Sequence, residues 1–246
     1  YGTRAAMIFV KRSPGSVRTV SLGSVVPLDV PTPLTMAKSA QVQFDRVLRD
    51  CAADAACHRA YPDLEGELAK IIARLDAGQV KVVPNGDSGE VTLSRGRVVE
   101  WSRGGLYRPS DGAELPWLVH QAYAGTWTPI VEGIQASATG MASALSVGFW
   151  LTMTCREDVA FIREDEIAPA TRGTWLGANR VREQMPACVG WPKTALPDGY
   201  RHPVRSSVPA LFVSGEDDAA SPPWFTARVA PGFTNRVEIV SRHQGH

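Results

Sequence analysis

The first 26 positions contain two consecutive apolar segments with different patterns. Residues 3–12 are apolar on almost every side and are followed by Pro14, which predicts a buried helix that ends before the proline. Residues 17–26 are rich in valine and predict a buried strand. A helix followed by such a strand is the order found in parallel sheets that helices cover on both faces.

The middle of the chain changes to a helical period. Apolar residues recur at i, i+4, i+7 and i+8 within residues 40–51 and again within residues 64–75, after which Gly78 provides a stop. These two stretches predict amphipathic helices. Further helices are expected from the capping residues Ser110 and Asp111 and from Thr128-Pro129.

Three short runs between these helices have a strand-like composition. They cover residues 80–83, 90–93 and 97–101, and Asn85-Gly86 and Arg95-Gly96 separate them. Such dipeptides between apolar runs predict a small β-hairpin insertion. We therefore expect residues 31–139 to form a mainly helical insertion that carries this hairpin.

The last hundred residues return to the pattern of the first thirty. Residues 145–154 are apolar and fit either a strand or a buried helix, which periodicity alone does not separate. A strand at residues 208–213, a helix at 222–230 and a strand at 236–240 then restore the strand, helix, strand order. The predicted fold class is α/β, in which residues 1–30 and 140–246 form the sheet domain.

Composition narrows the range of partners. The 246 residues carry 26 Lys and Arg against 25 Asp and Glu, and no basic run is interleaved with aromatic residues. We therefore expect neither nucleic acid nor an anionic membrane surface as a partner, and no apolar stretch has the roughly 20 residues of a membrane span. A small substrate fits better, and nothing in the sequence indicates a cofactor.

Four cysteines and a nearby histidine are the candidates for cross-linking or metal binding. Cys51, Cys57, Cys155 and Cys188 form an even set, which suits either two disulfides or scattered buried thiols. A zinc site would depend on Cys51, Cys57 and His58, but no CxxC or HxxxH pair accompanies them, so we expect no metal.

Candidate chemistry lies at the ends of the last two predicted strands. An acidic turn that contains Asp217 and Asp218 follows the first of them, and His243 and His246 follow the second. Taken singly, such an acid is more often a helix cap or a solvated turn, and such a histidine is more often structural. An acid and then a histidine after successive late strands is, however, the order of a Ser, acid, His hydrolase triad.

Motifs along the whole chain resemble one family, the tripeptidyl aminopeptidase-like (TAP-like) α/β-hydrolases, which are relatives of the proline iminopeptidases. Residues 214–223 resemble the family's S-G-E-x-D-x-x-[ST]-P-P, and Tyr1-Gly2-Thr3-Arg4 matches the part of its G-x-S-Y-G-T-R elbow after the serine. The ending Gly245-His246 keeps the Gly-His of the family's G-x-G-H. The cap motifs are residues 51–57 followed by Tyr61-Pro62, residues 154–158, and Ala187-Cys188 with Trp191-Pro192.

The resemblance implies a role for each of these positions. The triad acid would be Asp218 and the base His246, and the nucleophile serine would stand immediately before Tyr1, whose backbone N–H would serve the oxyanion hole. The four cysteines would form two disulfides, and a Cys155–Cys188 bridge would close a long loop. Glu157 would recognise the amino group of a substrate, although a surface acid pair with Asp158 is an equal alternative.

The expected function is a serine exopeptidase that releases short N-terminal peptides through an acyl-enzyme. Residues 1–246 would be the C-terminal portion of this secreted or cell-envelope enzyme and would be inactive without the N-terminal half of the fold. Two alternatives remain open: an esterase that acts on short esters with the same triad, and a hydrolase-like module that binds peptides without catalysis.

Overall fold

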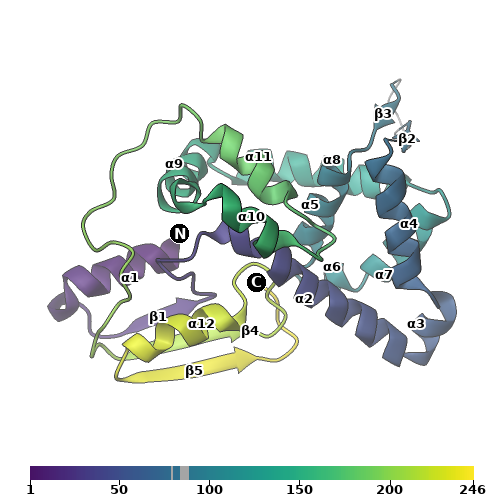
Figure 1. Ribbon diagram of the computed structural model, residues 1–246. Coiled ribbons are helices and arrows are strands. Elements are labelled where there is room, and N and C mark those ends of the chain that lie inside the picture. Colours follow the sequence, from purple (N-terminus) through teal and green to yellow (C-terminus); the bar gives the residue numbers. More distant parts are fainter. Residues whose placement is uncertain (79, 84–88) are drawn as a thin grey trace.

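A computed structural model describes residues 1–78, 80–83 and 89–246 of the chain. The strands of its parallel sheet lie together at one end of the molecule and most of its helices at the other (Figure 1). Mixed helices and a small parallel sheet agree with the predicted α/β class.

The parallel sheet has three strands in the order β1-β4-β5. Its strands are β1 (Val20–Gly23), β4 (Ala210–Gly215) and β5 (Arg236–Ser241). The register places Leu22 beside Phe212 and Phe212 beside Glu238. The three strands expected from the sequence are therefore present, although the first is shorter than residues 17–26.

Helices α1 (Gly2–Arg12) and α12 (Pro223–Val229) pack against the sheet. Met7 of α1 packs with Leu22, Phe212 and Phe233 in one apolar core. The expectation that residues 3–12 are buried all round is wrong, because Phe9 is 54% exposed and only one side of α1 faces the core.

The other face of the sheet is open. Leu211 pairs in register with Val237 and Val213 with Ile239, and the side chains of Val237 and Ile239 are 59% and 47% exposed. Strands β1 and β5 are the two edges of the sheet. The apolar stabilisation of the sheet therefore comes from the face that α1 and α12 cover.

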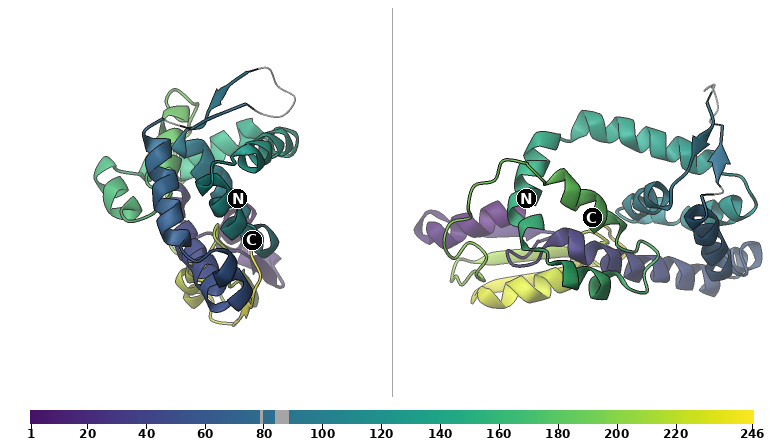
Figure 2. Two further views of the ribbon diagram at one scale, coloured as in Figure 1. Left: turned by 90° about the vertical axis from the view of Figure 1, so that its right-hand side faces the viewer. Right: turned by 45° about the horizontal axis from the view of Figure 1, so that its top comes forward.

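Between β1 and β4 the chain is mainly helical, and Figure 2 shows α8 running back from the far helices towards α9 beside the sheet. We call α2 to α11 the helical region. Its helices are α2 (Thr32–Ala53), α3 (Ala55–Ala60), α4 (Leu64–Asp76), α5 (Arg95–Gly105), α6 (Pro109–Gly112), α7 (Leu115–Tyr123), α8 (Thr128–Ala144), α9 (Val147–Glu157), α10 (Glu164–Thr171) and α11 (Asn179–Ala187).

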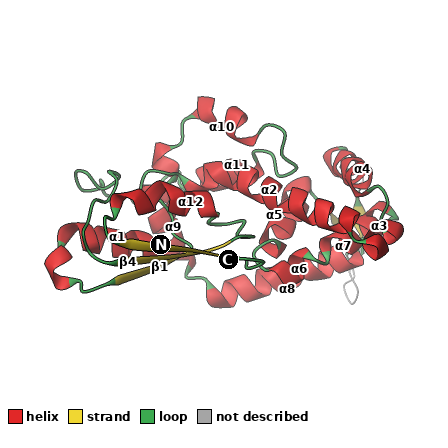
Figure 3. Cartoon of the chain, turned by 90° about the horizontal axis from the view of Figure 1, so that it is seen from below, coloured by secondary structure: helices red, strands yellow, loops and turns green. Residues whose placement is uncertain are grey.

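The helical region has a core of its own, in which Phe44, Ile71, Val99 and Leu118 are buried together. The predicted boundary at residues 139 and 140 falls inside α8, the ambiguous stretch 145–154 is largely α9, and the chain rejoins the sheet only at β4. Figure 3 shows the three strands of the parallel sheet at one end of this long molecule and α3, α4 and α7 at the other.

The predicted hairpin insertion is correct in its first two strands. Strand β2 (Lys81–Val82) pairs antiparallel with β3 (Val91–Thr92), while Asn85-Gly86 lies outside the described residues. Residues 97–101, however, belong to α5 and not to a strand. Ser94 caps that helix through its hydroxyl, which accepts a hydrogen bond from the N–H of Arg97.

Two disulfides tie helices of this region together. Cys51 and Cys57 join the end of α2 to α3, and Cys155 and Cys188 join α9 to the residue that follows α11. The second bridge spans 33 residues and the first spans 6. Among the described residues, no helix is long and apolar enough to cross a membrane.

Candidate active site

Asp218 lies in the loop after β4 and is completely buried. One carboxylate oxygen accepts hydrogen bonds from the backbone N–H groups of Ala220 and Ser221, at 2.8 and 2.7 Å. The other accepts a hydrogen bond from the Ser24 hydroxyl at 2.8 Å. Burial alone would raise the pKa of Asp218, but these bonds, together with that from His246, outweigh it and hold the pKa below its ordinary value.

His246 lies beyond β5, and its Nδ1 is 2.9 Å from Oδ2 of Asp218. Because an ionised carboxylate only accepts hydrogen bonds, Nδ1 carries the proton in this contact. The backbone N–H of His246 donates to the carbonyl of Tyr107 at 2.8 Å, and the Tyr107 ring packs against the imidazole with centroids 5.2 Å apart. The histidine side chain remains 39% exposed.

Two glycines allow these loops to approach each other. A Cβ on Gly215 would lie 2.2 Å from the carbonyl oxygen of Gly245, and a Cβ on Gly245 would lie 2.1 Å from that of Tyr107. Distances this short are not tolerated, so both positions require glycine. The Gly-His ending thus has a steric reason: the glycine lets His246 reach Tyr107 and Asp218.

The competing acid and histidine are engaged elsewhere. Asp217 forms an ion pair with Arg46 at 2.5 Å, and the backbone N–H of His243 donates to the Glu216 carboxylate at 3.3 Å. Burial is the main cause that raises the pKa of Asp217, in contrast to Asp218. The structure therefore joins Asp218 with His246 and gives Asp217 a different partner.

Tyr1 stands at the N-terminal end of α1. Because α1 runs antiparallel to the strands, this end points towards the strand ends where His246 lies (Figure 1). The N–H of Val26, two residues beyond Ser24, donates to the Thr3 hydroxyl at 3.3 Å and ties the first turn of α1 to the loop after β1. No acidic side chain of α1 itself lies in this turn, which carries the positive end of the helix dipole.

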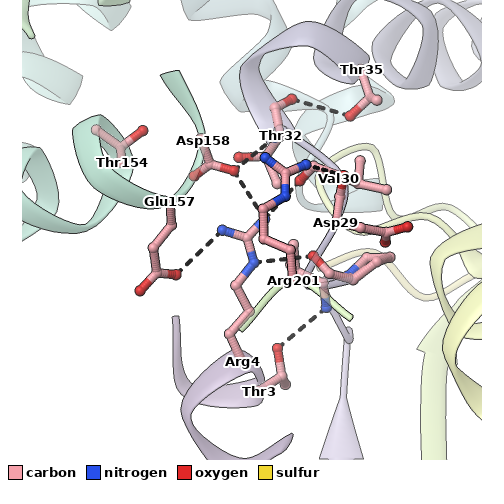
Figure 4. Close-up of polar contacts among 12 residues, drawn as sticks. Thr3, Arg4, Asp29, Val30, Thr32, Thr35, Thr154, Glu157, Asp158 and Arg201 are labelled. Carbon is pink, nitrogen blue, oxygen red and sulfur yellow. Dashed lines mark hydrogen bonds and ion pairs between the residues drawn. The ribbon is translucent and has the colours of Figure 1, made fainter. Parts of the chain in front are cut away.

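Glu157, at the end of α9, is only 4% exposed, so the alternative of a surface acid pair with Asp158 is wrong. Figure 4 shows its carboxylate facing Arg4, with 3.5 Å between Oε2 and Nη1. Asp158 is closer to Arg4, at 2.9 Å, and also accepts the N–H of Thr32 at 3.0 Å. Arg4 itself is 2% exposed and donates to the carbonyls of Pro27 and Val30.

The Arg4 cluster, defined as Arg4, Glu157 and Asp158, lies next to Tyr1. Burial and then Asp158 are the main causes that raise the pKa of the Tyr1 phenol, and Glu157 contributes in the same direction. Burial and a hydrogen bond with Glu157 likewise raise the pKa of Tyr200. The two carboxylates are therefore within electrostatic reach of the first residue of α1.

Reasoning from sequence missed three contributors to the site. The sequence pattern places Arg4 in an apolar helix and Ser24 in a buried strand, and it gives Tyr107 no role. No motif singles out Ser24 or Tyr107, whereas a lone arginine among apolar residues was a visible signal for a buried ion pair.

Other features of the described residues do not form part of this site. A groove of about 340 Å³ lies between α2, α10 and the start of α12, and its lining includes Val42 and Trp224 but neither Asp218 nor His246. Within the described part of the chain, no group of three or more His, Cys, Asp or Glu residues is arranged to hold a metal ion.

Taken together, a buried, ionised carboxylate and a partly exposed histidine meet over the ends of two adjacent parallel strands. This is the arrangement that an α/β-hydrolase places at the ends of its late strands. Residues 174–246 match the family model described as TAP-like protein, and this match supports assigning the chain to the TAP-like α/β-hydrolases. The matched part contains β4, α12, β5 and both loops, and a comparison with curated proteins found no match.

Proposed function

We propose that Asp218 and His246 are the acid and base of a serine hydrolase of the exopeptidase type. The observation that supports this most is the 2.9 Å contact between Nδ1 of His246 and Oδ2 of the buried Asp218. In this role Asp218 fixes the tautomer of the ring, so that the unprotonated Nε2 can take the proton of a serine hydroxyl. The carboxylate then stabilises the imidazolium that forms while the acyl-enzyme is made.

The nucleophile in this proposal is a serine immediately before Tyr1 in the intact enzyme. The N-terminal end of α1 supports the idea, because the positive end of its dipole favours the negative charge of an oxyanion. The helical region would be the cap over this site, to which it contributes Tyr107. Residues 1–246 alone would then be inactive.

Labelling with a fluorophosphonate tests this assignment. The intact enzyme should be modified at the serine before Tyr1, and residues 1–246 alone should remain unmodified. Modification of residues 1–246 at one of their own serines would overturn the placement of the nucleophile.

Glu157 would recognise the free amino group of the substrate. Arg4 pairs with two carboxylates, of which Asp158 is nearer and also accepts the N–H of Thr32, while Glu157 is 3.5 Å from the guanidinium and also faces Tyr200. Within these ion pairs, two negative charges face one guanidinium, which favours a substrate ammonium group beside Tyr1. The two disulfides support an extracellular or cell-envelope enzyme, since such bonds persist in oxidising compartments.

The variant Glu157→Gln tests this recognition in the intact enzyme. It should raise KM for a free-amine Ala-Ala-Pro anilide about tenfold, because a charge-assisted hydrogen bond is lost, and should spare an N-acylated ester. Asp158→Asn is the structural control and should affect both substrates alike. Equal losses on both substrates in Glu157→Gln would rule out amine recognition by this residue.

An esterase is the second candidate, because the same pair of residues serves many acyl groups. The ratio of kcat/KM for the anilide and for a short-chain ester separates the two. An ester preference that persists with free-amine substrates would favour the esterase.

A further inference from the structure

Ser24 is the residue at which the chain leaves β1. Its backbone N–H still donates to the carbonyl of Val213 at 2.9 Å, which continues the pairing of β1 with β4. Its φ of 49° then lies in the left-handed region, which costs a residue other than glycine about 1 kcal/mol. A glycine would avoid this cost, so the serine at this position calls for an explanation in terms of its side chain.

The hydroxyl of Ser24 supplies that explanation. It donates to Oδ2 of Asp218 at 2.8 Å, and this is the same oxygen that accepts Nδ1 of His246. The left-handed turn therefore directs the side chain from the end of one strand to the acid loop of the next.

The carboxylate of Asp218 makes four hydrogen bonds with the described residues, two at each oxygen. The backbone N–H groups of Ala220 and Ser221 hold Oδ1 from within the acid's own loop. Oδ2 has only Ser24 and His246 among the hydrogen bonds that the described residues make to it. Since His246 is the group to be oriented, Ser24 is the fixed donor that sets the direction of Oδ2.

We propose that Ser24 is a positioning residue, which holds the Asp218 carboxylate in the orientation that His246 requires. This role rests on the proposed function of the Asp218 and His246 pair. Ser24 is not an alternative nucleophile, because its hydroxyl proton is committed to the acid and not to the histidine.

Its test uses residues 1–246 and proton NMR of the His246 ring. In the unchanged chain, the Nδ1 proton should give a low-field signal because it is hydrogen-bonded to a carboxylate. In Ser24→Ala and in Ser24→Gly this signal should move upfield, and its exchange with water should become about tenfold faster, because the carboxylate loses a fixed donor. Exposed Ser21 on the same strand provides the control variant Ser21→Ala, which should leave the signal unchanged.

The two substitutions separate positioning from stability. Alanine keeps the left-handed strain while glycine removes it, so their stabilities should differ although both lack the hydroxyl. An effect shared by both variants supports the positioning role, and an effect confined to Ser24→Ala would contradict it.

The outcome is independent of hydrolysis. An unchanged Nδ1 signal in both variants, or no low-field signal in the unchanged chain, would overturn the role of Ser24. The two proposals can also fail separately. If the Nδ1 signal changes as expected in both Ser24 variants but the intact enzyme needs neither Asp218 nor His246 for activity, only the proposed function is refuted.

Discussion

Replacing Arg4 with methionine would leave Glu157 and Asp158 buried without their guanidinium. All three side chains are at most 4% exposed, and Arg4 also donates to two backbone carbonyls. Removing one partner of a buried ion pair typically costs about 3 to 5 kcal/mol, because the remaining charge is desolvated and unpaired. Methionine keeps most of the volume of the side chain, so a cavity contributes little to this figure.

Urea unfolding measures this loss directly. In thermal unfolding, the same loss of about 4 kcal/mol would lower the Tm of a chain of this size by roughly 10 °C. In urea, the midpoint concentration should fall. The dependence of the unfolding free energy on urea concentration should stay the same, since the surface exposed on unfolding hardly changes.

A double variant tests whether charge is the cause. Arg4→Met with Asp158→Asn should be less destabilised than the sum of the two single changes, because the second change removes the uncompensated charge. The exposed pair of Arg163 with Asp165 offers the control Arg163→Met, which should leave the midpoint unchanged. A loss below about 1 kcal/mol for Arg4→Met, or strict additivity in the double variant, would refute the account of the Arg4 cluster.

Two further predictions concern the disulfides and the glycine before His246. Replacing Cys155 and Cys188 by serine should cost about 4 kcal/mol, and replacing Cys51 and Cys57 about 2 kcal/mol, because the first pair closes the longer loop; urea unfolding of both variants would contradict this if the order were reversed. Gly245→Ala should displace His246, since its Cβ would meet the Tyr107 carbonyl oxygen, and should abolish the low-field Nδ1 signal. Gly104→Ala in α5, whose added Cβ meets nothing within 4 Å, is the matched control and should stabilise the chain by about 0.5 to 1 kcal/mol. A retained Nδ1 signal in Gly245→Ala would show that the close approach is not needed.

Sequence reasoning predicted the fold best where a local pattern determines it. The period of residues 64–75 became α4, Thr128 does begin α8, and the strand, helix, strand order at the end of the chain became β4, α12 and β5. It failed at residues 97–101, where apolar composition suggested a strand. The Ser94 cap and the burial of Val98 and Val99 along one side decide for a helix.

For the candidate site, the sequence predicted individual residues but not the contacts that surround them. The order of acid and histidine after late strands pointed to the two loops, the family resemblance selected Asp218 and His246 within them, and the structure brings these two residues together. The Ser24 contact depends on a left-handed turn and on strand register, which no short pattern encodes. Burial of Glu157 depends on packing of α9 against α1, so the sequence left its environment open.

The central claim is that Asp218 and His246 act together as the acid and base of a serine hydrolase. Its most direct test is the kcat of the intact enzyme on an Ala-Ala-Pro anilide, compared with His246→Ala, Asp218→Asn and the double variant. We predict losses of about 10⁴-fold or more for His246→Ala, and little further loss when both residues are changed, because the two work as one unit. Turnover that survives His246→Ala would contradict the account.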